Sequence, residues 1–160
     1  MVYEISFDIA AVLIFIILIS LFYGKKKSPY RYNVAFGALL AASLLTAVFD
    51  LISAYMISYP DLFSQRLSYL VNIIYLSAQN AATPIYTYYI VLLTNSGRKT
   101  GWRKALLLLA PSIMELLLIL TTPYTGLIFY YDQSGYYRHG SLFILLYIVV
   151  VYYLMLGAYF

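Results

Sequence analysis

Residues 5–23 read ISFDIAAVLIFIILISLFY, an apolar run whose one charged residue, Asp8, lies near its start. A helix that crosses the hydrocarbon core of a bilayer needs about 20 mostly apolar residues, so this run is long enough to span a membrane. A cleaved signal peptide is a poor alternative, because the N-terminal flank carries Glu4 but no Lys or Arg and no small-residue cleavage site follows Ser20. We therefore expect the first helix to remain in the mature protein.

The composition of the whole chain extends this interpretation. Of its 160 residues, 64% are hydrophobic and only 10% are charged, and the mean hydropathy is +0.84. These values exclude a soluble globular domain and an intrinsically disordered chain, and the absence of cysteine excludes a disulfide scaffold. The net charge of +4 comes from short basic clusters between apolar runs. Such clusters are typical of membrane topology signals, so we expect the lipid bilayer as a partner and no nucleic acid.

Five runs of the sequence have the length and composition of membrane spans. They are residues Ile5–Tyr23, Val34–Ile57, Leu67–Thr94, Ala105–Leu120 and Leu142–Phe160. The sequence therefore predicts an all-α integral membrane protein, a five-helix transmembrane bundle formed as a single module over residues 1–160.

The basic residues of the short loops predict the orientation, since Lys and Arg resist transfer to the outer face. Eight of the ten lie in the first and third loops: Lys25, Lys26, Lys27, Arg31, Arg98, Lys99, Arg103 and Lys104. The second loop has only Arg66 and the fourth only Arg138. We therefore expect a multi-pass protein of the plasma membrane with its N-terminus outside and the end of the fifth helix inside. That helix stops without a basic flank or polar tail, which indicates either a chain cut short or a natural five-helix protein.

The fourth loop, Thr121–Ser141, is far longer than a turn between helices requires. Strand-forming residues 127–131 precede Asp132–Gly135, which has the pattern of a type I turn, and Tyr136–His139 can return as a second strand. We expect a short extracellular β-hairpin. Its aromatic residues either form an interfacial belt or make a lid over a pocket between the helices. The candidate lid residues are Tyr130, Tyr131, Tyr136, Tyr137 and Arg138.

Polar residues inside the predicted spans mark the candidate site. Two of them, Asp50 and Glu115, are acidic and lie well inside a span, and an ionisable residue there is costly unless it faces the bundle interior or water. Ser43, Thr46, Asp50 and Ser53 share one helical face, as do Asn72, Tyr75, Gln79, Thr83 and Tyr86, with Asn80 beside them. We expect one cavity, open outward, with Asp50, Asn72, Gln79, Asn80 and Glu115 as ligand-binding candidates. The alternative is that these groups only hydrogen-bond the helices together.

The sequence offers little for catalysis or metal binding. It has no cysteine, one histidine and no glycine-rich phosphate loop or nucleophile elbow, so we expect neither a metal, a cofactor nor an enzymatic activity of this chain. The histidine, His139, is expected to close the hairpin, with pH sensing as an alternative.

Several stretches together resemble one bacterial module. They are DLISA at 50–54, the third helix with Asn72, Asn80 and Pro84, TPYTGLIFYYD at 122–132 and GYYRHG at 135–140. The chain resembles the N-terminal seven-helix membrane sensor region of Gram-positive diguanylate cyclases, cyclic di-GMP phosphodiesterases and histidine kinases. The resemblance covers nearly all 160 residues and implies the first five of seven helices. The sequence contains no GGDEF or EAL motif and no sixth or seventh helix.

The resemblance implies a signal-input module. It would pass an extracellular or membrane stimulus to a cytoplasmic output domain, in the first place a diguanylate cyclase, and would act as a homodimer with an unidentified ligand. Two other functions remain open from the residues alone. A transporter or channel fragment would use the polar faces as a path, although no internal repeat is evident. A small structural membrane protein would act by packing alone.

Overall fold

The computed structural model describes residues 5–24, 30–94 and 102–159. In this part of the chain there are five α-helices, one 3-10 turn and one pair of strands. In chain order they are α1 (Ser6–Gly24), α2 (Arg31–Ser58), η1 (Pro60–Leu62), α3 (Gln65–Thr94), α4 (Trp102–Thr125), β1 (Phe129–Tyr131), β2 (Tyr137–His139) and α5 (Ile144–Tyr159). The prediction of five helices with a β-hairpin between the fourth and fifth is confirmed.

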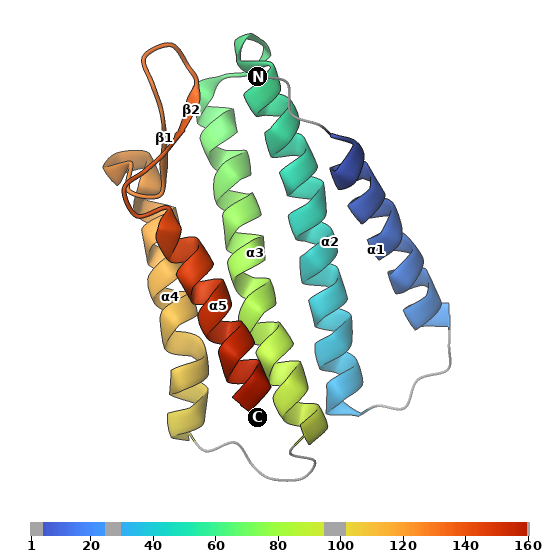
Figure 1. The fold of residues 1–160 in the computed structure, drawn as a ribbon. Helices are drawn as coiled ribbons and strands as arrows, with labels where there is room; N and C mark the ends of the chain where they lie inside the picture. The colour runs from blue at the N-terminus through green and yellow to red at the C-terminus, as the bar shows by residue number, and fades with distance from the viewer. Residues whose placement is uncertain (1–4, 25–29, 95–101, 160) are drawn as a thin grey trace.

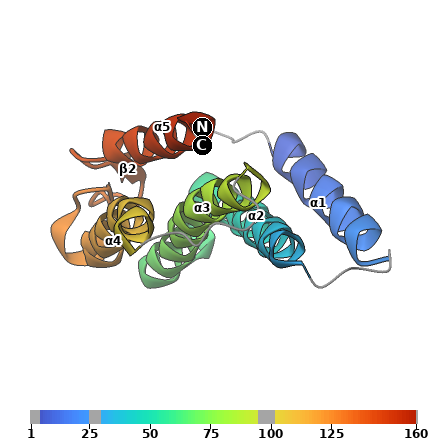
Figure 2. The same ribbon diagram turned by 90° about the horizontal axis from the view of Figure 1, so that it is seen from below.

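The helices form a bundle in which α3 is central (Figure 1). It packs against α2, α4 and α5, whereas α1 packs against α2. Seen from below, α2 and α3 lie in the middle of the bundle, with α4 and α5 on one side of them and α1 on the other (Figure 2). The turn between α2 and α3 and the β-hairpin lie at the same end of the bundle (Figure 1). We call this the hairpin end.

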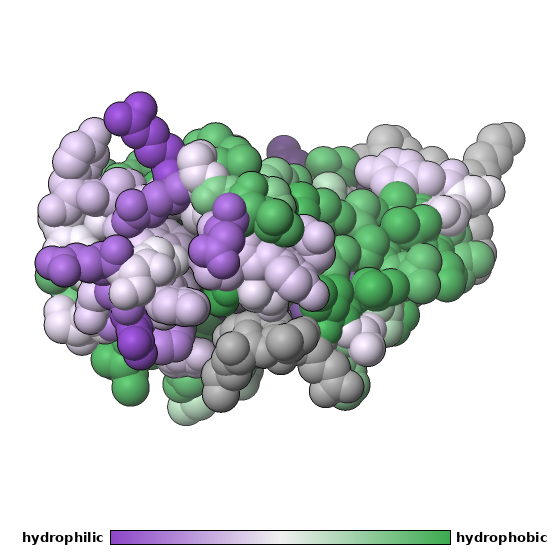
Figure 3. Space-filling model, turned by 90° about the horizontal axis from the view of Figure 1, so that it is seen from above, coloured by the Kyte–Doolittle hydropathy of each residue, from purple (hydrophilic) through white to green (hydrophobic). Residues whose placement is uncertain are grey.

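Three of the helical segments are long and apolar enough to cross a membrane. They are Ser6–Gly24, Arg31–Ser58 and Leu108–Thr125. The longer helix α3 does not qualify, because its Ser, Thr, Asn, Gln and Tyr side chains lower its hydropathy, and α5 is described over only 16 residues. Hydrophilic residues gather at the hairpin side of the molecule, while the flank at α1 is largely hydrophobic (Figure 3). The loop segments that carry most of the predicted topology signal, 25–29 and 95–101, lie outside the described residues.

The fourth helix is longer than predicted. We expected it to end at Leu120, yet it continues to Thr125, which shortens the predicted loop by five residues. The added turn is stabilised by the Thr122 hydroxyl, which donates a hydrogen bond to the Leu118 carbonyl oxygen at 2.7 Å. Gly126 then ends the helix with a positive φ of 64°, and its N–H bonds the Thr122 carbonyl oxygen.

The hairpin has the predicted turn. Its strands are antiparallel and pair Phe129 with His139 and Tyr131 with Tyr137. The Gly135 N–H donates to the Asp132 carbonyl oxygen at 2.9 Å, and Gly135 adopts a φ of 79°. This is the hydrogen bonding of a type I turn followed by a left-handed glycine, a common three-residue hairpin loop.

The hydrophobic core lies beneath this hairpin. Ile128 and Phe129 are fully buried and pack with Leu76 of α3, Ile119 of α4 and Leu146 of α5. The hairpin segment is therefore part of the core. Through these contacts it holds α3, α4 and α5 together.

Gly140 provides a direct test of this packing. A Cβ atom at this position would collide with the backbone carbonyl oxygens of Gly126 and Leu127, at the base of the hairpin. We expect Gly140→Ala to lower the free energy of unfolding in mixed micelles by about 1–3 kcal/mol, the usual cost of overpacking.

The matched control is Gly157→Ala in α5, where a Cβ would lie 3.6 Å from the Tyr86 ring, an ordinary contact. This variant should unfold with unchanged or slightly higher stability, since alanine favours helix. Equal stability of the two variants would show that the hairpin base is not packed as described.

Candidate functional site

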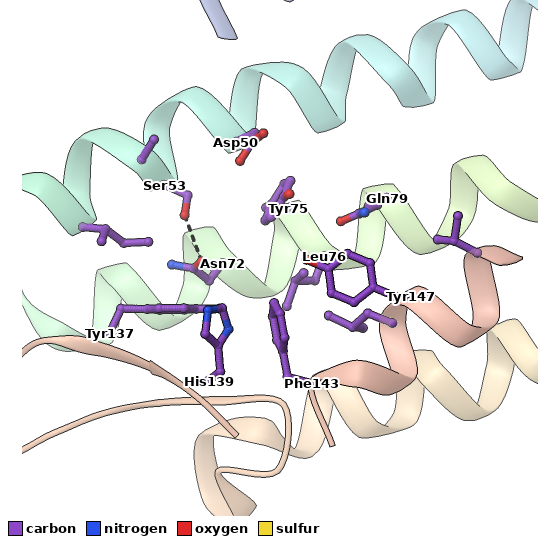
Figure 4. A pocket seen from close by; sticks show the side chains of 14 residues that line it. Asp50, Ser53, Asn72, Tyr75, Leu76, Gln79, Tyr137, His139, Phe143 and Tyr147 are labelled. Carbon is purple, nitrogen blue, oxygen red and sulfur yellow. Dashed lines mark hydrogen bonds between the residues drawn. The ribbon is translucent and has the colours of Figure 1, made fainter. Parts of the chain in front are cut away.

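A cavity of about 390 Å³ lies between α2, α3, α5 and the hairpin (Figure 4). We call it the Asp50 cavity. Its polar and aromatic lining comes from all four elements, and the lining residues are Asp50, Ser53, Ala54, Ile57, Asn72, Tyr75, Leu76, Gln79, Tyr137, His139, Phe143, Leu146, Tyr147 and Val150. The predicted polar faces of the second and third helices therefore meet across one hollow.

Asn72 fixes one end of this cavity. The Ser53 hydroxyl donates to the Asn72 Oδ1 at 2.9 Å, as Figure 4 shows. The Asn72 Nδ2 donates to the Ser68 carbonyl oxygen and to the Tyr131 hydroxyl, both at 2.9 Å. One buried amide thus joins α2, α3 and the hairpin, with both donor hydrogens and the acceptor in use.

The candidate lid residues divide between the two faces of the hairpin. Tyr131 and Tyr137 face inward: Tyr131 bonds Asn72, and Tyr137 lines the Asp50 cavity. Tyr130 and Tyr136 are exposed. Burial raises the pKa of Tyr131 to about 12, so its hydroxyl stays neutral at physiological pH. Of the candidate lid residues, Tyr137 lines the Asp50 cavity, and Tyr131 reaches its Asn72 end.

Arg138 takes no part in the cavity. Its Nε lies 3.3 Å from the Asp132 Oδ2 on the outer surface of the turn. Asp132 Oδ1 accepts hydrogen bonds from the backbone N–H groups of Ser134 and Tyr136. The Tyr136 N–H, with additional contributions from Arg138 and Ser134, lowers the pKa of Asp132 below its usual range. The two backbone hydrogen bonds to Asp132 Oδ1 hold the turn together.

Asp50 lies where the cavity meets a second hollow. Its side chain faces Tyr75, whose hydroxyl is close enough to interact with the carboxyl group, and Gln79 lies next to them (Figure 4). The second hollow, about 350 Å³, is lined by α1, α2 and α3 and by Val150 of α5, and we call it the α1–α5 groove. It is lined by Asp8, Ala11, Phe15, Ser43, Thr46, Ala47, Asp50, Gln79, Ala82, Thr83 and Val150.

Asn80 belongs to a different cluster, which joins α3 to α4. Its Nδ2 donates to the Ser112 carbonyl oxygen at 3.0 Å, and the Ser112 hydroxyl donates to the Asn80 Oδ1. Pro84 cannot donate to the Asn80 carbonyl oxygen, and the Thr83 hydroxyl replaces the missing donor at 2.9 Å. These bonds correspond to the alternative interpretation of the polar residues as links between helices.

Glu115 also lies away from the Asp50 cavity. It is only 5% exposed, and its Oε2 has no hydrogen-bond partner among the described residues. The expectation that Asp50 and Glu115 share one cavity is wrong. Asp50 of α2 lines the hollow toward α5 and α1, whereas Glu115 of α4 is absent from the lining of either hollow because α4 packs on the other side of α3.

Most of the residues that line the cavity were not predicted as site residues, among them His139, Phe143 and Tyr147. His139, the last residue of β2, lines the cavity. The centroid of its ring lies 3.8 Å from that of the Phe143 ring. Tyr147 lies one helical turn beyond Phe143. The spacing of four residues from His139 to Phe143 to Tyr147 is the signal in the sequence that could have placed them on one side.

The described residues, which omit 1–4, 25–29, 95–101 and 160, contain no group of three or more His, Asp or Glu side chains suited to a metal ion. Comparison of the chain with models of protein families, with curated proteins and with solved structures finds no match. The function must therefore be argued from the geometry of the two hollows.

The hydrogen bonds of Asn72 lead to a prediction. Asn72→Leu keeps the branched shape of the side chain but leaves the Ser53 hydroxyl and the Tyr131 hydroxyl without this partner, at about 1–3 kcal/mol for each group. We expect amide hydrogen exchange in residues 128–140 to become at least about tenfold faster.

Thr121→Val is the control, since the Thr121 hydroxyl is exposed and bonds only carbonyl oxygens of its own helix. The amide of Ser112, in the separate Asn80 cluster, should exchange at the wild-type rate in both variants. Unchanged exchange of the hairpin in Asn72→Leu would contradict the proposed anchoring.

Proposed function

We propose that the chain is a membrane-embedded signal-input module whose stimulus acts at the Asp50 cavity. The observation that carries the proposal is the construction of this cavity: a polar hollow inside an apolar bundle, roofed by a hairpin that a single amide ties to two helices. A protein that acted only by packing would have no need of such a hollow, since polar groups lining it are costly unless water or a ligand pairs with them.

Membrane embedding is supported by the surfaces of the helices. No residue of α1 is buried, and its large apolar side chains, such as Phe7, Leu13 and Leu21, are largely exposed. The apolar residues Met114 and Leu117 of α4 and Met155 of α5 are exposed in the same way. Lipid is the solvent that such a surface suits. With the basic loops inside, as their charge predicts, the hairpin end faces outward.

The route of the signal follows α5. Its first two turns contribute Leu146, Tyr147 and Val150 to the cavity, and its later residue Tyr153 bonds the backbone of α4. A ligand in the cavity therefore contacts the helix whose far end points away from the hairpin (Figure 1). A stimulus shifts the equilibrium between two helix arrangements only by its difference in affinity for them.

The output belongs to the same proposal. The resemblance of the chain to the membrane regions of bacterial signalling enzymes supports a cytoplasmic output domain, in the first place a diguanylate cyclase, and a homodimeric assembly. In this proposal the chain itself binds and transmits, and the chemistry is carried out elsewhere.

Filling the cavity tests this function without knowledge of the ligand. Ala54 is buried and lines the Asp50 cavity, so Ala54→Phe places a ring inside it. Spin labels at Val34→Cys and Met155→Cys, both exposed and both remote from the hairpin, report the distance between α2 and α5. We expect the filled cavity to move this distance by about 1–2 Å or to add a second population.

Ala38→Phe, at an exposed position of α2, is the control and should leave the distance distribution unchanged. The same distribution in Ala54→Phe and in the parent would contradict the signal-input function. A solute flux across liposomes that carry the unlabelled chain would instead favour a transporter or channel.

A further inference from the structure

We propose that the Asp50 cavity binds an organic ammonium cation, with the Asp50 carboxylate as its anionic partner and the surrounding aromatic rings as its walls. This inference rests on the proposed function and specifies the chemical class of the stimulus.

The charges around the two hollows favour a cation. Asp50 lines both the cavity and the α1–α5 groove, and a second carboxyl group, that of Asp8, lines the groove. Among the side chains that line either hollow there is no Lys or Arg. Arg138 of the hairpin forms an ion pair with Asp132 on the outer surface. A cationic ligand would supply the positive charge that no Lys or Arg of either lining provides for Asp50.

The walls of the cavity favour an organic cation over a bare metal ion. Phe143 and Tyr147 enter from the α5 side, Tyr75 from α3 and Tyr137 from the hairpin, and all four line the cavity together with Asp50 and Gln79 (Figure 4). Aromatic faces attract ammonium groups, and clusters of them recognise alkylated ammonium ligands. A hard metal ion would need oxygen ligands in the place of these rings.

The size and surroundings of the cavity restrict the ligand further. A volume of about 390 Å³ is at the small end of the range for ligand pockets, which suits a small molecule. Two sources can supply the same chemistry. A free ammonium compound would enter from the hairpin end, whereas the headgroup of a phospholipid would enter through the α1–α5 groove, which meets the cavity at Asp50 and Gln79.

Choline and its neutral carbon analogue 3,3-dimethylbutan-1-ol test the proposal, because they share a shape and differ in charge. Binding of each is measured by calorimetry on the chain in nanodiscs of phosphatidylglycerol, which lacks a cationic headgroup. We expect choline to bind at least about tenfold more tightly, a difference that a carboxylate and aromatic walls together readily produce.

Two variants locate the preference. Asp50→Asn should abolish it, whereas Asp61→Asn, the same charge change at an exposed position of η1, should retain it. Tyr147→Leu is an independent variant that keeps Asp50 and should weaken choline binding several-fold without affecting the neutral analogue. Equal binding of the two probes, binding of neither, or a preference that survives both Asp50→Asn and Tyr147→Leu would overturn the proposal.

A change of the nanodisc lipid distinguishes the two possible sources of the cation. In nanodiscs of phosphatidylcholine, weaker binding of added choline than in phosphatidylglycerol supports a bound headgroup, and equal binding supports a free ammonium compound. The spin-label experiment with Ala54→Phe uses no ligand. A changed distance there together with no preference for choline would therefore remove the cation and leave the signal-input function standing.

Discussion

A buried polar group must be paired, and in this chain that requirement is met most completely at Asn72. Its amide accepts from Ser53 and donates to the Ser68 carbonyl oxygen and to Tyr131. Ser53 belongs to α2, Ser68 to the preceding turn of α3 and Tyr131 to the hairpin. The Asn72 side chain therefore links α2, α3 and the hairpin. The hairpin in turn brings Phe129 into the core and Tyr137 over the cavity. Loss of this amide would loosen the roof and the core together.

The same requirement distinguishes the two sides of α3. Toward α4, the Asn80 and Ser112 side chains satisfy each other, and the Tyr153 hydroxyl bridges the Leu108 carbonyl oxygen and the Ser112 N–H, so this side is locked. Toward α1 and α5 the polar side chains of Asp50 and Gln79 face open space. Bonds between helices hold a membrane bundle in one arrangement. The side on which Asp50 and Gln79 face the two hollows is therefore the side on which a ligand can change the arrangement.

Much of the architecture could be predicted from the sequence, because helix length and turn chemistry are local properties. The apolar runs give five helices, and Asp132 with Gly135 gives the hairpin turn. The end of α4 was missed, since a Thr hydroxyl bonding within its own helix supports a further turn where Pro123 suggests a loop. The polar stripe of α3 was found, yet its period alone could not show that Asn80 turns toward α4. Nor could the sequence show that Glu115 of α4 lies away from the Asp50 cavity. Which face meets which neighbour depends on packing, and so the contributions of His139, Phe143 and Tyr147 became evident only in the structure.

The proposed signal-input function requires that the chain cross a bilayer with its hairpin outside. The sequence has no cysteine, so single cysteines can be introduced without background. Ser134→Cys lies at the exposed tip of the turn, and Lys26→Cys lies in the first basic loop. The account predicts that a membrane-impermeant thiol reagent labels Ser134→Cys in intact cells and Lys26→Cys only after lysis. Labelling of Lys26→Cys in intact cells, with Ser134→Cys protected until lysis, would contradict it.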